Sequence, residues 1–426
     1  MRIVFYSTNS NRFDTERVKI TVMPSDTQQF DTFCHKYPEH EFYCVSQSPS
    51  LFMGENTILL STQSDYVEVS QKIIALKPDI AVALSFWIEP YDWLCINDSL
   101  VAEELNKNGI KTICNSAKTC LLCFNKRETN SFLTSKGFNS AKYVFADHNL
   151  YFCAGSNKDV IHNVYKDSLY KEIEKLELPL IIKDNSGLSS YGMTVVNTYA
   201  EAKGYLNSKR NNSDRLIEEY IDGEHFGVEV YGCDDNYTVL PVFFITKNKF
   251  GITSPKQSTK HGPVLKADKN KYRINSLNRT INKLCYSLKI NGCAQIDLIY
   301  SRKKWYIVEI NPRLSGMSYL YSSRNNRSVF DMIFESCILH KKIRDCGLYS
   351  VDLKLPVLSE EQLSILYNYP EIVLINQWNN KEARQEREKG FCECIIRTEN
   401  KKQADEFLKK LSSLEFLHDF FKPECP

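Results

Sequence analysis

The sequence predicts a protein of mixed α/β and α+β class, in which a doubly wound parallel sheet comes first and antiparallel strands follow. Three observations support this class. β-rich runs alternate with a helical pattern over residues 1–115. Strand patterns separated by turn residues then fill the centre of the chain. Residues 346–426 mix helical and strand patterns.

The first expected strand is RIVFYS at 2–7, a run of β-branched and aromatic residues. A helical pattern at 66–76 precedes the run KPDIAVALSF at 77–86, and NGIKTIC at 108–114 ends the unit. Strands that alternate with helices are typical of a parallel sheet. No GxGxxG fingerprint occurs in this region, so the sequence assigns it no dinucleotide.

A helix is expected next, in NKRETNSFLTSKGF. Asn125 is its expected N-cap, Glu128 lies three residues on, and Gly137 is its expected end. An amphipathic helix at 275–290, a hairpin and helical material near 326–341 complete the centre of the chain. The expected central strands are LPLIIKD, GMTVVNT, RLIEEYIDG, FGVEVYG and YTVLPVFFIT; the expected C-terminal elements are EEQLSILYNY, EIVLINQW, FCECIIRT and KQADEFLKKLSSL.

Composition excludes several classes. The 426 residues predict two to four domains or one elaborate multi-lobed enzyme, and 42% of them are apolar or aromatic and 25% charged. The net charge is 54 − 52 = +2, which gives no electrostatic case for binding nucleic acid or a membrane surface. The start MRIVFYSTNS is too weakly apolar for a signal peptide, and no run is long enough to span a bilayer. We therefore expect a cytoplasmic protein with 15 reduced cysteines. Cys120 and Cys123 of CLLC are expected to be buried thiols on a helix face, with a metal or redox role as the alternative.

Two β-runs flank the polar SRKK in AQIDLIYSRKKWYIVEINPR. If they pair with Asp297 opposite Glu309, the alternation places Ile299, Trp305 and Ile307 on the same face as the two acids. Facing carboxylates repel, so a cation should lie between them. With the carbonyl of Asn311 they form an oxygen-rich site suited to Mg²⁺. Arg313 could then hold a phosphate or carboxylate in bidentate fashion. A surface hairpin neutralised by Lys and Arg is the alternative.

Two other segments carry chemistry. In LPLIIKDNSGLSSYGM a strand delivers Lys183 to a loop rich in Ser and Gly, which offers backbone N–H groups to phosphate oxygens. In RLIEEYIDGEHFGVE a strand ends at Glu218 and Glu219 before an acidic turn, where backbone groups could pair with an adenine edge. Taken alone, each segment is better explained as an ordinary turn, because turns of this composition are common. The small residues of the first loop are Ser186, Gly187, Ser189, Ser190 and Gly192.

Together, the order and spacing of these segments over about residues 115–320 resemble the ATP-grasp superfamily. EINPRLSG resembles its carbamoyl-phosphate-synthetase-like branch. The resemblance implies an ATP-grasp fold, in which two α+β lobes enclose ATP. It divides the chain into a Rossmann-like domain at 1–115, an ATP-grasp domain at 116–345 with a mobile lid lobe at about 150–220, and a small C-terminal α+β domain at 346–426.

The resemblance also implies roles for individual residues. Lys126 and Lys183 would contact the nucleotide phosphates, with the Ser- and Gly-rich loop closing above them. Asp297, Glu309 and Asn311 would hold Mg²⁺, with Mn²⁺ as an alternative. Arg313 would hold the transferring phosphoryl group, so that Arg313, Glu309 and Asn311 form the catalytic set. The implied ATP-binding set is Lys126, Lys183, Ser189, Ser190, Gly192, Met193, Glu218, Glu219, Tyr220, Ile221, Glu224 and His225.

Three positions depart from the family pattern. Asp184 stands where a proline usually follows the motif lysine, and Asn125 replaces an acid. His225 occupies the usual place of the ribose-binding acid, and Glu224 comes one residue earlier. The sequence leaves open which of the two contacts ribose.

The resemblance implies an ATP-dependent ligase that joins a small-molecule carboxylate, such as an amino acid or short peptide, to an amine through an acyl phosphate and releases ADP and phosphate. The alternatives are a bicarbonate-using carboxylase and a non-catalytic nucleotide-binding module. A homodimer stays open, and neither nucleic acid nor a membrane is an expected partner. Substrate candidates come from TSPKQSTKHGPV, which is otherwise a solvated basic loop, and from the stretch after the signature; they are Lys256, Lys260, His261, Arg313, Ser315, Gly316, Arg324 and Arg327.

Overall fold

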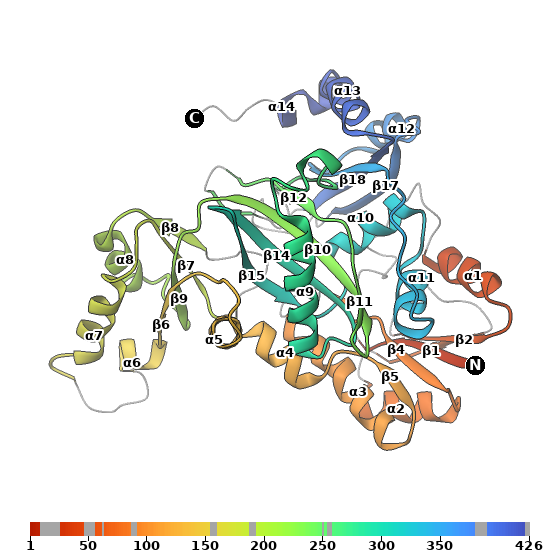
Figure 1. Ribbon diagram of the computed structural model, residues 1–426, viewed down its shortest axis with the longest axis horizontal. Coiled ribbons are helices and arrows are strands. Elements are labelled where there is room, and N and C mark those ends of the chain that lie inside the picture. The colour runs from red at the N-terminus through yellow and green to blue at the C-terminus, as the bar shows by residue number, and fades with distance from the viewer. Residues whose placement is uncertain are drawn as a thin grey trace.

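The computed structural model describes residues 1–8, 26–46, 56–61, 64–86, 92–153, 160–186, 193–248, 251–253, 258–379 and 390–421. Its described strands form sheets of five, four and nine strands. Figure 1 shows the four-stranded lobe on the left, the nine-stranded sheet in the centre and the five-stranded sheet at the lower right. The predicted mixed class, with parallel pairing first and antiparallel pairing after it, is confirmed. No helix in the described part is long and apolar enough to cross a membrane.

The N-terminal sheet has the order β3-β2-β1-β4-β5, and all its strand pairs are parallel. The chain therefore reverses its winding between β1 and β4, the kind of edge at which open α/β sheets bind ligands. The carboxylate of the buried Asp98 joins the two strand ends, because it accepts from Thr8 and from Ser85. The elements are β1 (Arg2–Ser7), α1 (Asp26–Lys36), β2 (Glu41–Ser46), β3 (Thr57–Leu59), α2 (Tyr66–Ala75), β4 (Ile80–Ala83), η1 (Asp92–Cys95), α3 (Ile96–Lys107) and β5 (Lys111–Ile113).

Two helices, α4 (Ala117–Phe124) and α5 (Lys126–Ser135), lead from this sheet into a small antiparallel lobe. Asn125 caps α5 as predicted, because its side chain accepts from the Glu128 N–H at 3.0 Å. The lobe has the strand order β6-β9-β7-β8 and its own apolar core. Its elements are β6 (Tyr143–Ala146), α6 (His148–Phe152), α7 (Val164–Ile173), β7 (Leu180–Asp184), β8 (Thr194–Val196), α8 (Tyr199–Leu206) and β9 (Arg215–Glu219).

The large sheet has the order β15-β14-β10-β12-β13-β16-β18-β17, with β11 paired to β10. α9 (Ile274–Leu288) covers one face over β10 and β14 (Figure 1), where its apolar stripe of Leu277, Ile281 and Leu284 enters the core. The strands are β10 (Glu224–Cys233), β11 (Asn236–Val239), β12 (Phe243–Ile245), β13 (Lys260–Gly262), β14 (Gly292–Ser301), β15 (Lys304–Asn311), β16 (Tyr349–Leu355), β17 (Ile372–Asn379) and β18 (Gly390–Thr398).

Residues 349–398 thus supply three strands to the same sheet that holds the hairpin β14–β15. They also have an apolar core of their own, under α12 and α13. The helices after the small lobe are η2 (Lys266–Asp268), α9 (Ile274–Leu288), α10 (Gly316–Asn325), α11 (Val329–Ile333), the π-helix η3 (Phe334–Ile338), α12 (Glu360–Tyr367), α13 (Lys401–Ser412), η5 (Glu415–Leu417) and α14 (His418–Phe421).

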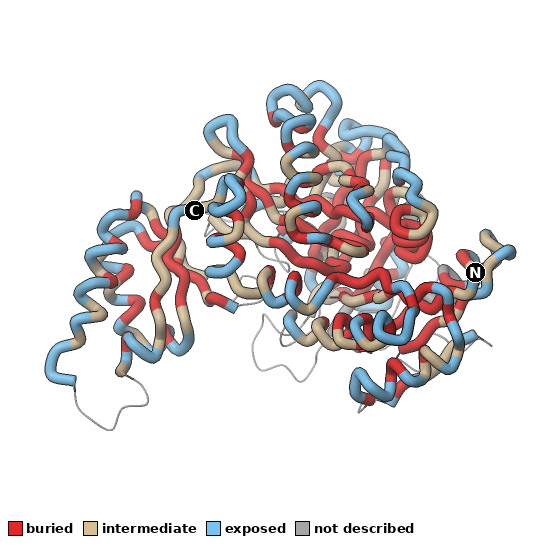
Figure 2. The backbone as a smooth tube through the Cα atoms, turned by 60° about the horizontal axis from the view of Figure 1, so that its bottom comes forward, coloured by how far each residue is buried: buried red, intermediate tan, exposed pale blue. Residues whose placement is uncertain are grey.

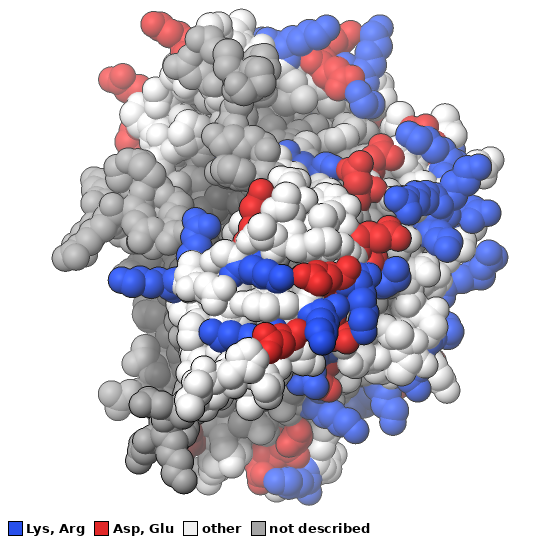
Figure 3. All heavy atoms as spheres, turned by 90° about the vertical axis from the view of Figure 1, so that its left-hand side faces the viewer, with Lys and Arg blue, Asp and Glu red and all other residues white. Residues whose placement is uncertain are grey.

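Buried residues follow the strands of all three sheets, whereas exposed residues follow the outer helices and turns (Figure 2). Cys120 and Cys123 are buried as predicted, and every described cysteine is a free thiol. Figure 3 shows acidic and basic side chains lying interspersed on the outer face of the small lobe. This mixed surface agrees with the balanced net charge of the sequence.

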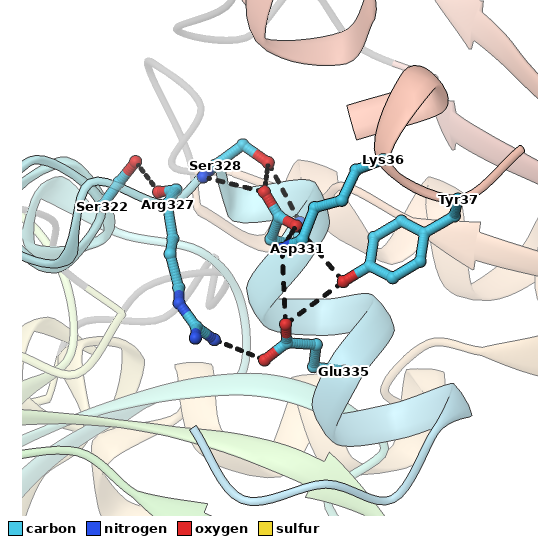
Figure 4. Close-up of polar contacts among 7 residues, drawn as sticks. All are labelled: Lys36, Tyr37, Ser322, Arg327, Ser328, Asp331 and Glu335. Atoms are coloured by element: carbon cyan, nitrogen blue, oxygen red, sulfur yellow. Dashed lines mark hydrogen bonds and ion pairs between the residues drawn. The ribbon is translucent and has the colours of Figure 1, made fainter. Parts of the chain in front are cut away.

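The N-terminal unit packs against helices α11 and η3 through aromatic rings and a polar cluster. Phe5 meets Phe330 of α11 edge-on, with ring centroids 5.2 Å apart, and Phe33 meets Phe334 at 5.4 Å. Each such pair contributes about 0.5–1.5 kcal/mol beyond its buried area. Beside the rings, Lys36 approaches Asp331 at 2.6 Å and the Tyr37 hydroxyl donates to Glu335 at 3.1 Å, as Figure 4 shows with Arg327 on the far side of Glu335.

Candidate active site

The hairpin β14–β15 places two carboxylates face to face. Asp297 pairs with Glu309 in the register, as the sequence predicts. The next pair is Leu298 with Ile307, so Val308 is an extra residue, a β-bulge. The prediction that Trp305 and Ile307 share the face of the two acids is therefore wrong: the bulge turns them to the other side, where they pack in the apolar core with Leu298.

The two carboxylates have opposite pKa shifts. Burial, with the charge of Glu309 second, raises the pKa of Asp297 to about 7. Burial also acts to raise the pKa of Glu309, but the nearby cations Lys126, Lys183 and Arg313 outweigh it and hold that pKa below its ordinary value. Near neutral pH Glu309 is therefore ionised, whereas Asp297 is only partly ionised. A cation bound between them would favour the ionised form of Asp297.

A line of hydrogen bonds joins the acids to Arg313. Gln295 lies opposite Asn311 in the register; its amide group donates to Asp297 Oδ1 at 2.6 Å and accepts from Asn311 Nδ2 at 2.7 Å. The Asn311 carbonyl oxygen accepts from the Arg313 guanidinium at 3.0 Å. Gln295, Asn311 and Arg313 are all buried. Gln295 was missed in the sequence reasoning, although its spacing of two residues from Asp297 on one strand was the available signal.

Two lysines complete the charges of the site. Lys126 Nζ, at the start of α5, lies 3.1 Å from Glu309 Oε1. Lys183 Nζ, on β7, lies 2.7 Å from Glu218 Oε2 on β9, and both side chains are buried. The Asn130 amide donates to the other oxygen of Glu218 at 2.8 Å. The site thus holds two lysine–carboxylate pairs, one within the small lobe and one between α5 and the large sheet.

A cleft runs between the small lobe and the large sheet. Residues of the predicted ATP-binding and metal sets that line it are Lys126, Lys183, Met193, Glu218, Glu219, Tyr220, Ile221, His225, Asp297 and Glu309. Ile181, Phe226, Ile245 and Ile299 supply apolar walls. Asn311 and Arg313 do not line this cleft. Three further residues of the predicted set lie outside the described residues: Ser189, Ser190 and Gly192. A cleft with apolar walls at one end and cations with paired acids at the other suits a nucleoside polyphosphate.

The two candidates for a ribose contact differ in position. Glu224 is exposed, does not line the cleft and accepts from the Tyr272 hydroxyl at 2.7 Å. His225 lines the cleft, and its buried Nε2 has no hydrogen-bond partner among the described residues. Burial lowers the pKa of His225 to about 4, so the ring is neutral near pH 7. The geometry favours His225.

The departure at Asp184 has a structural reason. Asp184 forms an ion pair with Arg215, which lies opposite it on β9 and is 2% exposed. The hydroxyl of Ser213 donates to the same carboxylate at 2.8 Å. A buried guanidinium needs an acid nearby, and proline could not supply one.

Two of the substrate candidates lie in the large sheet. Lys260 and His261 belong to strand β13, so the prediction of a loop is wrong at these residues, while Lys256 lies outside the described residues. Lys260 is paired with the buried Asp352 of β16. His261 stacks on Phe244 with centroids 5.0 Å apart, and Tyr349 lies 3.1 Å from its Nδ1. Strand pairing with β16, which the sequence reasoning did not foresee, accounts for these positions.

Ser315 and Gly316 begin α10, behind the hairpin. The Ser315 and Ser318 hydroxyls both donate to Glu229 Oε1 at 2.7 Å, and the Tyr231 hydroxyl donates to Oε2 at 2.9 Å. Burial raises the pKa of Glu229 to about 7.

Arg324 is fully buried and pairs with Asp345, and Arg327 pairs with Glu335. Arg324 and Arg327 therefore serve the fold in this structure.

A second cleft meets the first from the other side. It is lined by η1 and α4, through Trp93, Lys118 and Leu121, and by Asn311 of the hairpin. Lys126 and Glu309 line both clefts. The ion pair between these two residues is therefore the place where the two clefts meet.

Metal ligands are available at the hairpin. Among the described residues no group of three or more His, Cys, Asp and Glu side chains could hold a metal ion. The hairpin instead offers two carboxylates and one amide oxygen, and Asp297 Oδ2 and Glu309 Oε2 make no hydrogen bond to a described residue. Such hard oxygen ligands fit Mg²⁺, which takes phosphate oxygens and water as its other ligands.

Residues 156–317 match a family model described as an ATP-grasp domain. The chain carries an ATP-grasp domain. It is 32% identical over 168 residues to a D-alanine--D-alanine ligase of Buchnera aphidicola, over 38% of this chain and 52% of that protein. It is 20% identical to a carbamoyl-phosphate synthase of Methanobrevibacter smithii, over 81% of this chain and 85% of that protein.

The whole chain also resembles solved structures. An L-amino acid ligase from Bacillus licheniformis superposes with a TM-score of 0.66 over 96% of both chains, at 15% sequence identity. At that identity the likeness concerns the fold alone. The N-terminal sheet and the C-terminal strands β16–β18 are therefore parts of one fold with the residues that match the family model, and the chain spans about half the length of the Buchnera relative.

Proposed function

We propose that this ATP-grasp protein is an ATP-dependent ligase that joins a small-molecule carboxylate to an amine through an acyl phosphate. The observation that supports it most is the convergence of three cations on Glu309, which faces Asp297 at the end of a cleft with apolar walls. Lys126, Lys183 and Arg313 all lower the pKa of Glu309 through their charge. A site with this charge distribution stabilises a moving phosphoryl group.

The nucleotide would lie with its base among Tyr220, Ile221 and Ile299 and its phosphates toward Lys126 and Lys183. Asp297, Glu309 and Asn311 would hold Mg²⁺, which neutralises phosphate charge when it is bound. Its binding also relieves the repulsion between the two acids. Gln295 orients both Asp297 and Asn311, since it contacts each of them.

The reaction would take place in two steps. A carboxylate oxygen attacks the γ-phosphorus, the bond from phosphorus to the bridging oxygen breaks, and ADP leaves with the bonding electrons. The amine then attacks the acyl carbon, phosphate leaves, and the protons lost from nitrogen pass to phosphate and solvent. Arg313 sits beside Asn311 and would hold the phosphoryl group through both steps.

Substrate identity is proposed only as a class: an amino acid or short peptide as the carboxylate, and an amine. ADP release measured over a matrix of amino acid pairs with MgATP tests this proposal. ADP that appears only when a carboxylate is present, together with an amide product, supports it. ADP release that depends on bicarbonate would contradict the ligase proposal and indicate a carboxylase. Tight ATP binding without turnover would contradict it and indicate a regulatory module.

A further inference from the structure

The second cleft has the features of an amine-substrate site, and we propose that it binds an α-amino acid with an apolar side chain as the incoming amine. This inference rests on the ligase function proposed above and names one of its substrates. The cleft lies between η1, α4 and the end of β15. Its lining contains Trp93, Lys118, Leu121, Glu128 and Asn311, in addition to the shared Lys126 and Glu309.

The position of the cleft suits the nucleophile. Lys126 and Glu309 form the wall that it shares with the nucleotide cleft. A phosphoryl group transferred near this pair would be reached by the nucleotide from one side and by a molecule in the second cleft from the other. When the amine attacks, the acyl phosphate is no longer bonded to ADP, but ADP still lies in the nucleotide cleft. A separate entrance lets the amine reach the acyl carbon without colliding with this bound ADP.

The lining also suits the chemistry of an amino acid. Trp93 is 46% exposed and Leu121 is 57% exposed, so two large apolar side chains of the lining are open to a ligand beside a polar site. An apolar side chain placed against them would remove that surface from water. The indole of Trp93 gives a broad, rigid wall, so the contact is costly to lose.

Two charged residues at the cleft match a zwitterion. Lys118, on α4, and Glu128, in the first turn of α5, are both exposed. Neither has an ion-pair partner in the part of the chain that the structure describes. By contrast, Lys126 and Glu309 are already paired with each other at 3.1 Å. Lys118 would bind the carboxylate of a free amino acid, and Glu128 would bind its ammonium group.

A partial reaction separates this site from the carboxylate site. Hydroxylamine is small enough to trap the acyl phosphate without using the apolar wall, so hydroxamate formation reports on the carboxylate and nucleotide alone. The carboxylate used is the one that gives the most hydroxamate with the unmodified protein. L-leucine, glycine and 3-methylbutylamine are then compared as amines, because the last has the side chain of leucine but no carboxylate.

We expect Trp93→Ala to raise the KM for leucine at least tenfold, to change the KM for glycine less than threefold, and to leave the rate of hydroxamate formation within twofold. Lys118→Gln should raise the KM for leucine at least fivefold and that for 3-methylbutylamine less than twofold. Tyr286→Ala is the matched control, because Tyr286 is an exposed aromatic residue on α9 that lines neither cleft.

Three results would overturn the inference. An unchanged KM for leucine in Trp93→Ala would show that the wall does not contact the amine. An equal loss of hydroxamate and amide would show that the cleft binds the carboxylate instead. If the unmodified protein forms no hydroxamate with any carboxylate, the ligase function itself fails and the inference fails with it. Circular dichroism of each variant excludes misfolding as the cause of a change.

Discussion

Asp297 and Glu309 face each other across one hairpin, yet the pKa of Asp297 is raised to about 7 while that of Glu309 is lowered. The asymmetry comes chiefly from Lys126, which lies 3.1 Å from Glu309, with Lys183 and Arg313 adding to its effect, whereas burial and the charge of Glu309 raise the pKa of Asp297. Asp297 is therefore only partly ionised near neutral pH, and a bound cation would favour its ionised form.

Metal affinity should depend on pH because of the proton on Asp297. Below pH 7 Mg²⁺ must displace the proton of Asp297, so we expect affinity with nucleotide bound to rise about tenfold from pH 6 to pH 8. Calorimetric titration of Mg²⁺ at the two pH values measures it. Asp297→Asn should weaken binding and abolish the dependence. A wild-type affinity that does not change between pH 6 and pH 8 would mean that Asp297 is not a ligand.

Lys183→Ala should lose nucleotide affinity and also stability. The variant leaves Glu218 buried without its cation, which typically costs about 3–5 kcal/mol. The double variant Lys183→Ala with Glu218→Gln should recover most of the stability but none of the nucleotide affinity. Urea unfolding and ATP calorimetry on the single and the double variant separate the effect on stability from the effect on nucleotide affinity. Lys175→Ala, which breaks an exposed pair with Glu172, is the control. Normal ATP binding by Lys183→Ala would contradict the placement of the phosphates.

Glu229→Gln should change how stability depends on pH. The pKa of Glu229 is raised from 4.5 to about 7 in the folded protein, so this group favours the folded state most at low pH. Its contribution is lost as pH rises from 4.5 through 7, by roughly 3 kcal/mol. The Gln variant should lack this loss. Free energies of unfolding at pH 5, 6, 7 and 8 test the prediction, and parallel profiles for the two proteins would refute it.

His225→Gln and Glu224→Gln should separate the two candidates for ribose contact. His225 lines the cleft with a buried, unpartnered nitrogen, whereas Glu224 is held by Tyr272. We expect His225→Gln to reduce the preference for ATP over 2′-deoxyATP or 3′-deoxyATP several-fold, and Glu224→Gln to leave it unchanged. Dissociation constants for the three nucleotides decide between them. The reverse pattern would assign the role to Glu224.

Much of this arrangement could be predicted from the sequence, because it depends on local pattern. Strand β1 has the predicted bounds, and the pairing of Asp297 with Glu309 follows from two β-runs joined by a short polar turn. The bulge at Val308 could not be predicted, since a strand with and without one extra residue has nearly the same composition. The placement of Lys260 in β13 depends on pairing with β16, about 90 residues later, and no local pattern reports such a contact.

The central claim is that the carboxylate attacks the γ-phosphoryl group beside Arg313. The most direct test uses a carboxylate labelled with ¹⁸O in both oxygens, MgATP and the amine, with the products analysed by mass spectrometry. The mechanism predicts that one labelled oxygen moves into inorganic phosphate and that ADP is the nucleotide released. Label found in AMP, with pyrophosphate as the second product, would contradict it, because attack would then have occurred at the α-phosphorus.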